Sequence, residues 1–153
     1  MRTIKFRAKD VFTDAWRYGD LVHNQKVTTT GLTPRTMVGG YEVDPETVCQ
    51  FTGFTDKNGK EIYESDVLIE TGDALPVFSS KTRFPCSIVF WHMAKGCFML
   101  QKCHVSIDSS GFNGCSYDKN FTKKHLKNFE VIGNVHEPEW QQKLHIQIQN
   151  KEE

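Results

Sequence analysis

The chain has 153 residues, of which 38% are hydrophobic and 25% are charged, and its formal net charge is zero. This composition is ordinary for one globular domain and excludes an intrinsically disordered chain or one that needs disulfides or a metal to fold. The longest apolar run, residues 88–91, is far too short for a membrane-spanning helix. We therefore expect a single domain over residues 1–153 and no contact with a membrane.

The N-terminal segment and the cysteines indicate a cytoplasmic protein. Residues 1–7 alternate apolar and polar or basic side chains and lack the continuous apolar stretch of a secretory signal. Five cysteines at irregular spacing, without such a signal, favour reduced thiols over a disulfide framework.

The chain is predicted to begin with a β-hairpin over residues 1–23. Residues 4–8 alternate with period two, Asp10 and Asp14 suit a turn, and extended character resumes at Trp16. Residues 24–40 are rich in Thr and Gly and contain few large apolar side chains. This composition predicts a long surface loop, and its length makes it a candidate for function.

A central β region is predicted over residues 41–102. Residues 47–52 favour a strand, and Asn58-Gly59 is typical of a tight hairpin turn because this pair tolerates positive φ. Extended structure continues after the turn. Residues 87–91 and 97–101, with a glycine-containing connection between them, predict another hairpin and therefore an antiparallel sheet.

The C-terminal region, residues 119–150, is predicted to hold a strand and a helix. It follows a loop-like stretch at 106–118, and residues 122–126 suit one helical turn before a strand at 129–135. After Pro138, side chains four residues apart favour a short helix, although alternation near the end leaves a strand open. The side chains in question are Trp140, Leu144 and Ile148 for the helix, and Leu144, Ile146 and Ile148 for the strand. The fold class is mainly β, with antiparallel hairpins and a short C-terminal helix.

Three acidic residues beside the predicted hairpin turn, Glu61, Glu64 and Asp66, are the nearest approach to a pair of catalytic carboxylates. Such catalysis needs two acids in different environments, so that one stays protonated while the other ionises. Acids next to a turn are more often solvated, and a hydrolase that uses Glu64 and Asp66 is the weaker interpretation. We assign no catalytic residue and expect a protein that is not an enzyme.

Metal and nucleotide sites are equally weak in the sequence. Cys97, Cys103 and His104 could meet His92 across the predicted hairpin, but no Cys-x-x-Cys pair is present, and buried cysteine is usually a small apolar residue. The glycine-rich patterns that cradle phosphates are also missing. We assign no metal and no cofactor.

One basic segment is the candidate nucleic-acid-binding site. Its lysines could hold phosphates and its two aromatic residues could stack bases. The alternative is that the lysines decorate a solvated turn while the aromatic residues fill the core, and the zero net charge favours that alternative. The lysines are Lys119, Lys123, Lys124 and Lys127, and the aromatic residues are Phe121 and Phe129. Other large aromatic residues are expected mostly in the core: Trp16, Tyr18, Tyr63, Trp91 and Phe98.

Charge is distributed unevenly along the chain. Residues 42–73 carry nine acids against two lysines, whereas residues 81–127 carry eight basic side chains against two acids. Oppositely charged surfaces can meet between copies of a chain or attract another protein. This separation motivates the hypothesis of a protein-interaction module that associates with itself or with a protein partner.

Three blocks of the sequence, in the same order along the chain, resemble the YopX family of phage and prophage proteins. They are Ile4 to Ala8 with Asp10 and the Trp16-x-Tyr18-Gly19-x-Leu21 pattern, residues 41–64, and residues 129–137. The chain departs from the family at Ser65, where glycine is common, at Lys9, where an aromatic residue is common, and at Cys49, where glycine is frequent.

The resemblance implies a mainly β, YopX-like domain encoded by a phage or an integrated mobile element, with a small SH3-like, partly open barrel. It transfers no catalytic residue. The leading hypothesis is a non-enzymatic interaction module in the host cytoplasm, with homo-oligomerisation as one form of interaction. The alternative is a nucleic-acid-binding accessory protein that uses residues 119–127.

Overall fold

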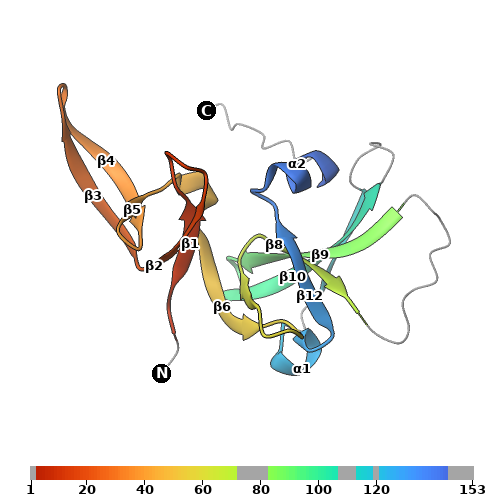
Figure 1. Ribbon diagram of the computed structural model, residues 1–153. Helices are drawn as coiled ribbons and strands as arrows, with labels where there is room; N and C mark the ends of the chain where they lie inside the picture. The colour runs from red at the N-terminus through yellow and green to blue at the C-terminus, as the bar shows by residue number, and fades with distance from the viewer. Residues whose placement is uncertain (1–2, 72–82, 107–112, 119–120, 145–153) are drawn as a thin grey trace. The chain divides into compact units, whose positions relative to one another are not determined.

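The alternating segments of the sequence form antiparallel β-sheets in the computed structural model, which describes residues 3–71, 83–106, 113–118 and 121–144 (Figure 1). The mainly β class with a short C-terminal helix is confirmed. The chain divides into two compact units, residues 1–53 and 54–153. The single domain over residues 1–153 stays a prediction.

The first unit contains two small sheets. In one, β1 pairs with β2 and β6, which confirms the predicted N-terminal hairpin; in the other the order is β3, β4, β5. A buried cluster of Ala8, Val38 and Val43 forms the core. The elements are β1 (Phe6–Lys9), β2 (Trp16–Gly19), β3 (Leu21–Thr28), β4 (Gly31–Val38), β5 (Tyr41–Glu42), the 3-10 helix η1 (Pro45–Thr47) and β6 (Cys49–Thr55).

The predicted loop over residues 24–40 is wrong. Most of it forms the β3–β4 hairpin, which pairs without interruption from Leu21 opposite Val38 to Thr28 opposite Gly31. Both faces of the outer part of this hairpin meet water, so its sequence lacks the contrast between apolar and polar positions that identifies a strand. Threonine-rich strands of this kind resemble a loop in composition.

The second unit is built on a five-stranded antiparallel sheet with the order β11, β10, β9, β8, β12. Within the described residues this sheet is open, with β11 and β12 at its edges, and the SH3-like character stays a prediction. The elements are β7 (Glu61–Tyr63), β8 (Asp66–Glu70), β9 (Arg83–His92), β10 (Cys97–Ser106), β11 (Asn113–Asp118), α1 (Lys123–Leu126), β12 (Phe129–Asn134) and α2 (Pro138–Leu144).

Four local predictions in this unit are confirmed: the hairpin of β9 and β10, the helical turn α1, the strand β12 and the helix α2. The turn at Asn58-Gly59 is confirmed as well, with Gly59 alone adopting positive φ, +83°. The predicted loop at 106–118 is wrong in its second half, because β11 pairs with β10. Its small and polar residues gain their hydrogen bonds from that neighbouring strand.

The cores of the second unit lie against the sheet. The larger cluster consists of Ile62, Leu68, Val89, Phe98, Leu100, Leu126, Phe129 and Val131. A smaller cluster joins Trp140 of α2 to Val67 and Cys86. Trp140 therefore anchors the C-terminal helix, as its spacing in the sequence predicted, whereas Ile146 and Ile148 lie outside the described residues.

Candidate interaction surface

Large apolar side chains are exposed mainly in the first unit. Of the ten such side chains among the described residues, eight belong to residues 4–41. They are Ile4, Val11, Phe12, Tyr18, Val22, Val27, Leu32 and Tyr41. Isolated exposed apolar residues are ordinary, but their concentration in residues 4–41 makes this part of the chain the candidate for an interaction surface.

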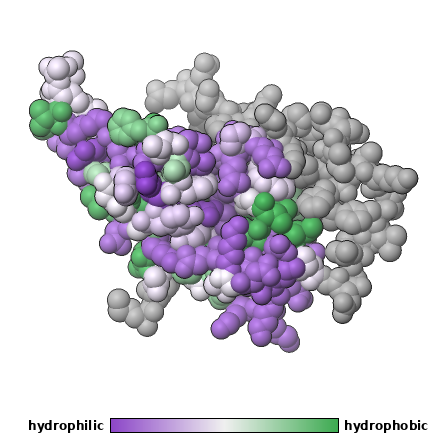
Figure 2. All heavy atoms as spheres, in the orientation of Figure 1, coloured by the Kyte–Doolittle hydropathy of each residue, from purple (hydrophilic) through white to green (hydrophobic). Residues whose placement is uncertain are grey.

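The outer end of the β3–β4 hairpin carries two of the most exposed of these residues. Val27 is 84% exposed and Leu32 is 65% exposed, and they lie directly opposite each other on neighbouring strands. Figure 2 shows apolar residues near this outer end. The two side chains form one apolar pair in water.

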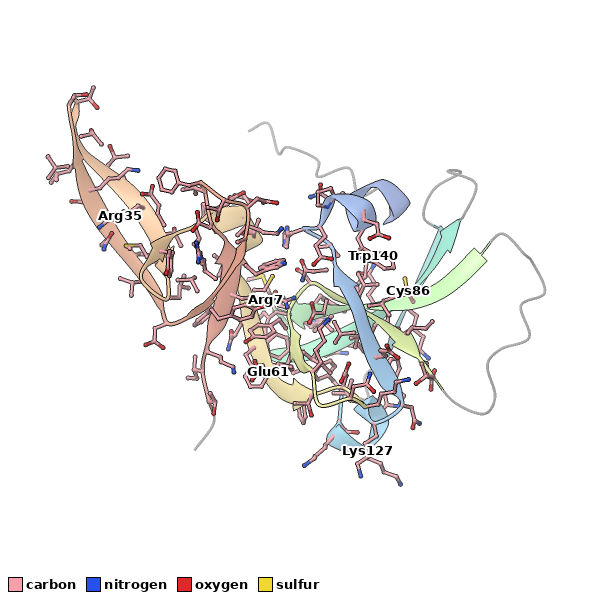
Figure 3. All side chains as sticks on the ribbon, viewed as in Figure 1. Arg7, Arg35, Glu61, Cys86, Lys127 and Trp140 are labelled. Atoms are coloured by element: carbon pink, nitrogen blue, oxygen red, sulfur yellow. The ribbon has the colours of Figure 1, made fainter. Side chains whose placement is uncertain are left out.

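Polar contacts hold the hairpin behind this pair. The Arg35 side chain, which Figure 3 shows on β4, donates a 2.6 Å hydrogen bond from Nε to Oδ1 of Asn24. The Lys26 ammonium forms an ion pair with Glu42 of β5. Together with the continuous backbone pairing of β3 and β4, these contacts tie β3 to β4 and to β5, so the apolar pair lies on an ordered two-stranded ribbon.

The aromatic residues that the sequence placed mostly in the core divide into two groups. Tyr63 and Phe98 are buried, which confirms that prediction. Tyr18 and Trp91 are 54% and 39% exposed, so these two lie outside the core. Trp16 is intermediate in burial and lies beside two cations: the Arg7 guanidinium carbon is 4.6 Å and the Lys9 Nζ is 5.1 Å from a ring centroid.

The basic candidate segment forms an exposed cluster at α1. Lys123, Lys124 and Lys127 are exposed, and Figure 3 shows Lys127 pointing away from the sheet, whereas Lys119 lies outside the described residues. Both aromatic residues of the candidate site make contacts within the fold, because Phe129 is buried in the core and the half-buried Phe121 packs edge-on against Phe54. The exposed part of the candidate site therefore consists of the three lysines.

Asp66, one of the two proposed catalytic carboxylates, is fully buried, so the prediction of a solvated turn is wrong for it. Its Oδ2 accepts a 2.8 Å hydrogen bond from the Tyr63 amide, and its Oδ1 accepts one of 3.2 Å from the Asn134 side chain. Glu61 accepts a hydrogen bond from the Tyr63 hydroxyl. These contacts give Asp66 a structural role that joins β8 to β12.

Asp10 and Asp56 hold turns in the same manner. Asp10 accepts hydrogen bonds from the Phe12 and Thr13 amides and from Arg17 Nε. The Phe12 amide makes the largest contribution to lowering the pKa of Asp10, burial opposes it, and Arg17 and Thr13 lower the pKa further. Some of the aspartates of the chain therefore stabilise its own turns.

The cysteine and histidine candidates do not converge. In the β9–β10 ladder Cys97 lies opposite His92, whereas Cys103 lies opposite Cys86. Cys97 and Cys103 are six positions apart on one strand, a separation of about 20 Å. Among the residues that the structure describes, no three His, Cys, Asp or Glu side chains form a metal-binding group. Burial raises the pKa of the Cys86 thiol to about 12 and keeps it protonated.

The fold and this surface define a small, mostly β protein built from antiparallel hairpins and closed by a short C-terminal helix. The YopX protein family matches residues 5–139, and the chain belongs to that family. The predicted resemblance is therefore confirmed.

Comparison with solved structures supports the same fold. The crystal structure of protein EF1440 from Enterococcus faecalis has 21% sequence identity and a TM-score of 0.52, with 89% of this chain and 95% of that chain covered. No curated protein matches the sequence. No helix in the described part of the chain has the length and apolar character needed to cross a bilayer.

Proposed function

We propose that this chain is a non-enzymatic interaction module, encoded by a phage or prophage, that associates with copies of itself through the β3–β4 hairpin in the host cytoplasm. The observation that carries the proposal is the exposed Val27–Leu32 pair at the end of an ordered two-stranded ribbon. An apolar pair held in water on such a ribbon is a surface suited to contact with another protein.

Association buries apolar side chains that each copy otherwise exposes to water. Complete burial of a Val or Leu side chain contributes about 1.5–3 kcal/mol, and each copy supplies two. A two-stranded ribbon is also marginally stable in water, and β5 pairs only with Met37 and Val38 at its inner end. Contact with a second copy stabilises the part of the hairpin that lacks other support.

A non-enzymatic role is supported by the contacts of Asp66, one of the two candidate catalytic carboxylates. Asp66 is buried and accepts hydrogen bonds from the Tyr63 amide and the Asn134 side chain. A carboxylate that satisfies buried donors has little freedom to take up or release a proton during a reaction. Interaction, and not bond-making, is the role that the exposed side chains favour.

Self-association is tested by sedimentation velocity over a wide range of concentration. We expect an oligomer whose population rises with concentration and persists at high salt, because apolar contacts are not screened. A variant with both Val27→Asp and Leu32→Asp should be monomeric. Met93→Asp, which changes an apolar side chain that is 88% exposed in the second unit, is the matched control. A parent chain that stays monomeric at high concentration would refute the proposal.

The second candidate function is nucleic-acid binding through the α1 lysines. It is favoured by one observation, the exposure of Lys123, Lys124 and Lys127 within five positions of the chain. A gel shift with single-stranded and duplex DNA should then weaken steeply with salt, because bound counterions are released. Replacement of the three lysines by Glu should abolish the shift, and Lys95→Glu in the exposed β9–β10 turn is the control. Binding that is insensitive to salt would exclude this function.

A further inference from the structure

One long edge of the first unit is open to pairing. The order β3, β4, β5 places β3 at the outside of its sheet, and no described strand pairs with its other side. The strand has eight residues, Leu21–Thr28, in continuous register with β4, and it contains neither a proline nor a bulge. Proteins usually block such an edge, because a row of free amides and carbonyls accepts another strand.

The opposite edge of the β3–β4 hairpin carries the usual protection. Strand β4 contains Pro34, which lacks an amide hydrogen and is accepted at sheet edges. Its inner end is covered by β5, and Val43 donates a 3.0 Å hydrogen bond to the Thr36 carbonyl. One edge of the hairpin is thus blocked, whereas the other is left continuous.

We propose that β3 pairs in antiparallel orientation with β3 of a second copy about a two-fold axis. This inference rests on the proposed self-association and specifies its geometry. A two-fold axis makes the contact self-complementary, since each copy offers the same donors and acceptors that it lacks. The outer ribbon of each copy then becomes part of a four-stranded sheet, which removes the instability of an isolated hairpin.

The charges on β3 are compatible with pairing of identical strands. Lys26 is the only Lys, Arg, Asp or Glu in β3, and its ammonium is compensated by Glu42 of the same copy. With Asn24 on the axis, Lys26 lies opposite Val22; with Gln25 on the axis, it lies opposite Asn24. Neither register places two lysines face to face, so like-charge repulsion does not oppose the contact. A neutral edge favours a second copy over a strongly charged partner.

The test uses cysteines placed at the axis. A residue on the axis lies opposite itself, and paired residues in an antiparallel sheet are close enough for a disulfide. Asn24→Cys and Gln25→Cys are made in a background with Cys97→Ser, Cys103→Ser and Cys115→Ser, and are oxidised mildly at concentrations where the parent associates. Thr33→Cys, on the β4 strand of the same hairpin, is the matched control.

We expect Asn24→Cys or Gln25→Cys to give a covalent dimer several-fold faster than Thr33→Cys. Hydrogen exchange of the β3 amides in the unmodified chain should also slow as concentration rises. If the chain associates but neither cysteine exceeds the control and β3 exchange does not change, edge pairing is refuted and the proposed function stands. If sedimentation shows only monomer, both are refuted.

Discussion

Asp56 and Val131 are 75 residues apart in the sequence, and the Asp56 carboxylate accepts a 3.0 Å hydrogen bond from the Val131 amide. The other carboxylate oxygen accepts from the Asn58 and Lys60 amides of its own turn. One side chain therefore shapes the β6–β7 turn and ties it to β12.

Replacement of Asp56 by Ala should lower the free energy of unfolding by about 3 kcal/mol, because buried amide donors lose their acceptor. Urea denaturation measures the change. Asp44→Ala is the control, since the Asp44 side chain accepts a hydrogen bond from the exposed Glu46 amide at the start of η1, and its loss should cost about 1 kcal/mol or less. Equal losses for the two variants would contradict the role assigned to Asp56.

The stability of the chain should fall in acid partly through Asp10. The pKa of Asp10 in the folded state is lowered from its usual 3.8, chiefly by the Phe12 amide. Its contribution is therefore complete above the usual pKa and is lost as pH falls through the lower, folded-state pKa. Urea midpoints between neutral pH and pH about 2 should decline less in Asp10→Asn than in the parent. Asp20→Asn, at an exposed position, should leave the decline unchanged.

Ser65 is predicted to be a site where glycine stabilises the fold. Its φ is +64°, a left-handed conformation that costs a residue with a side chain about 1–2 kcal/mol. Glycine removes this strain, but its greater conformational freedom in the unfolded chain lowers stability by about 0.4–1 kcal/mol. The net effect of Ser65→Gly should be a stabilisation of about 0.5–1 kcal/mol. Thermal and urea unfolding measure the gain. Ser65→Ala keeps the strain and should give no gain; a stabilised Ala variant would contradict the explanation.

Gly133 should not tolerate a methyl group. A Cβ at this position would overlap the indole nitrogen of Trp140, which is buried at 6% exposure. Gly133→Ala should destabilise the protein by about 1–3 kcal/mol, as overpacking in a core does. In a Trp140→Leu background the same change should cost much less, because the overlapping ring is gone. Additive losses in this double-mutant cycle would show that the two residues do not interact.

Short-range patterns predicted much of the fold. Alternation identified β1, and the spacing after Pro138 identified α2, since each of these signals lies within a few residues. The β3–β4 hairpin was missed because both faces of its outer part are exposed to water. Apolar and polar residues therefore do not alternate along its strands. Asp66 was misread because its partner Asn134 lies 68 residues away, and no local pattern reports such a contact.

The candidate surface was less predictable than the fold. Val27 and Leu32 sit in a polar stretch whose composition indicates a loop, and only the register of the hairpin brings them together. The basic segment was visible in the sequence as charge, but the burial of Phe129 depends on the packing of the whole unit. A sequence shows how charges are distributed along the chain, but it does not show which residues of neighbouring strands lie opposite each other.

The packing of Trp140 against Gly133 determines where α2 docks on the sheet. A helix of seven residues is too short to hold its shape alone in water, so it depends on its place against the sheet. The gap left by the missing side chain admits the indole at one point of β12 only. If α2 moved along β12 by one helical turn, the Trp140 indole would be exposed to water and the space over Gly133 would be empty. The absence of a side chain at Gly133 therefore selects one docked position for α2.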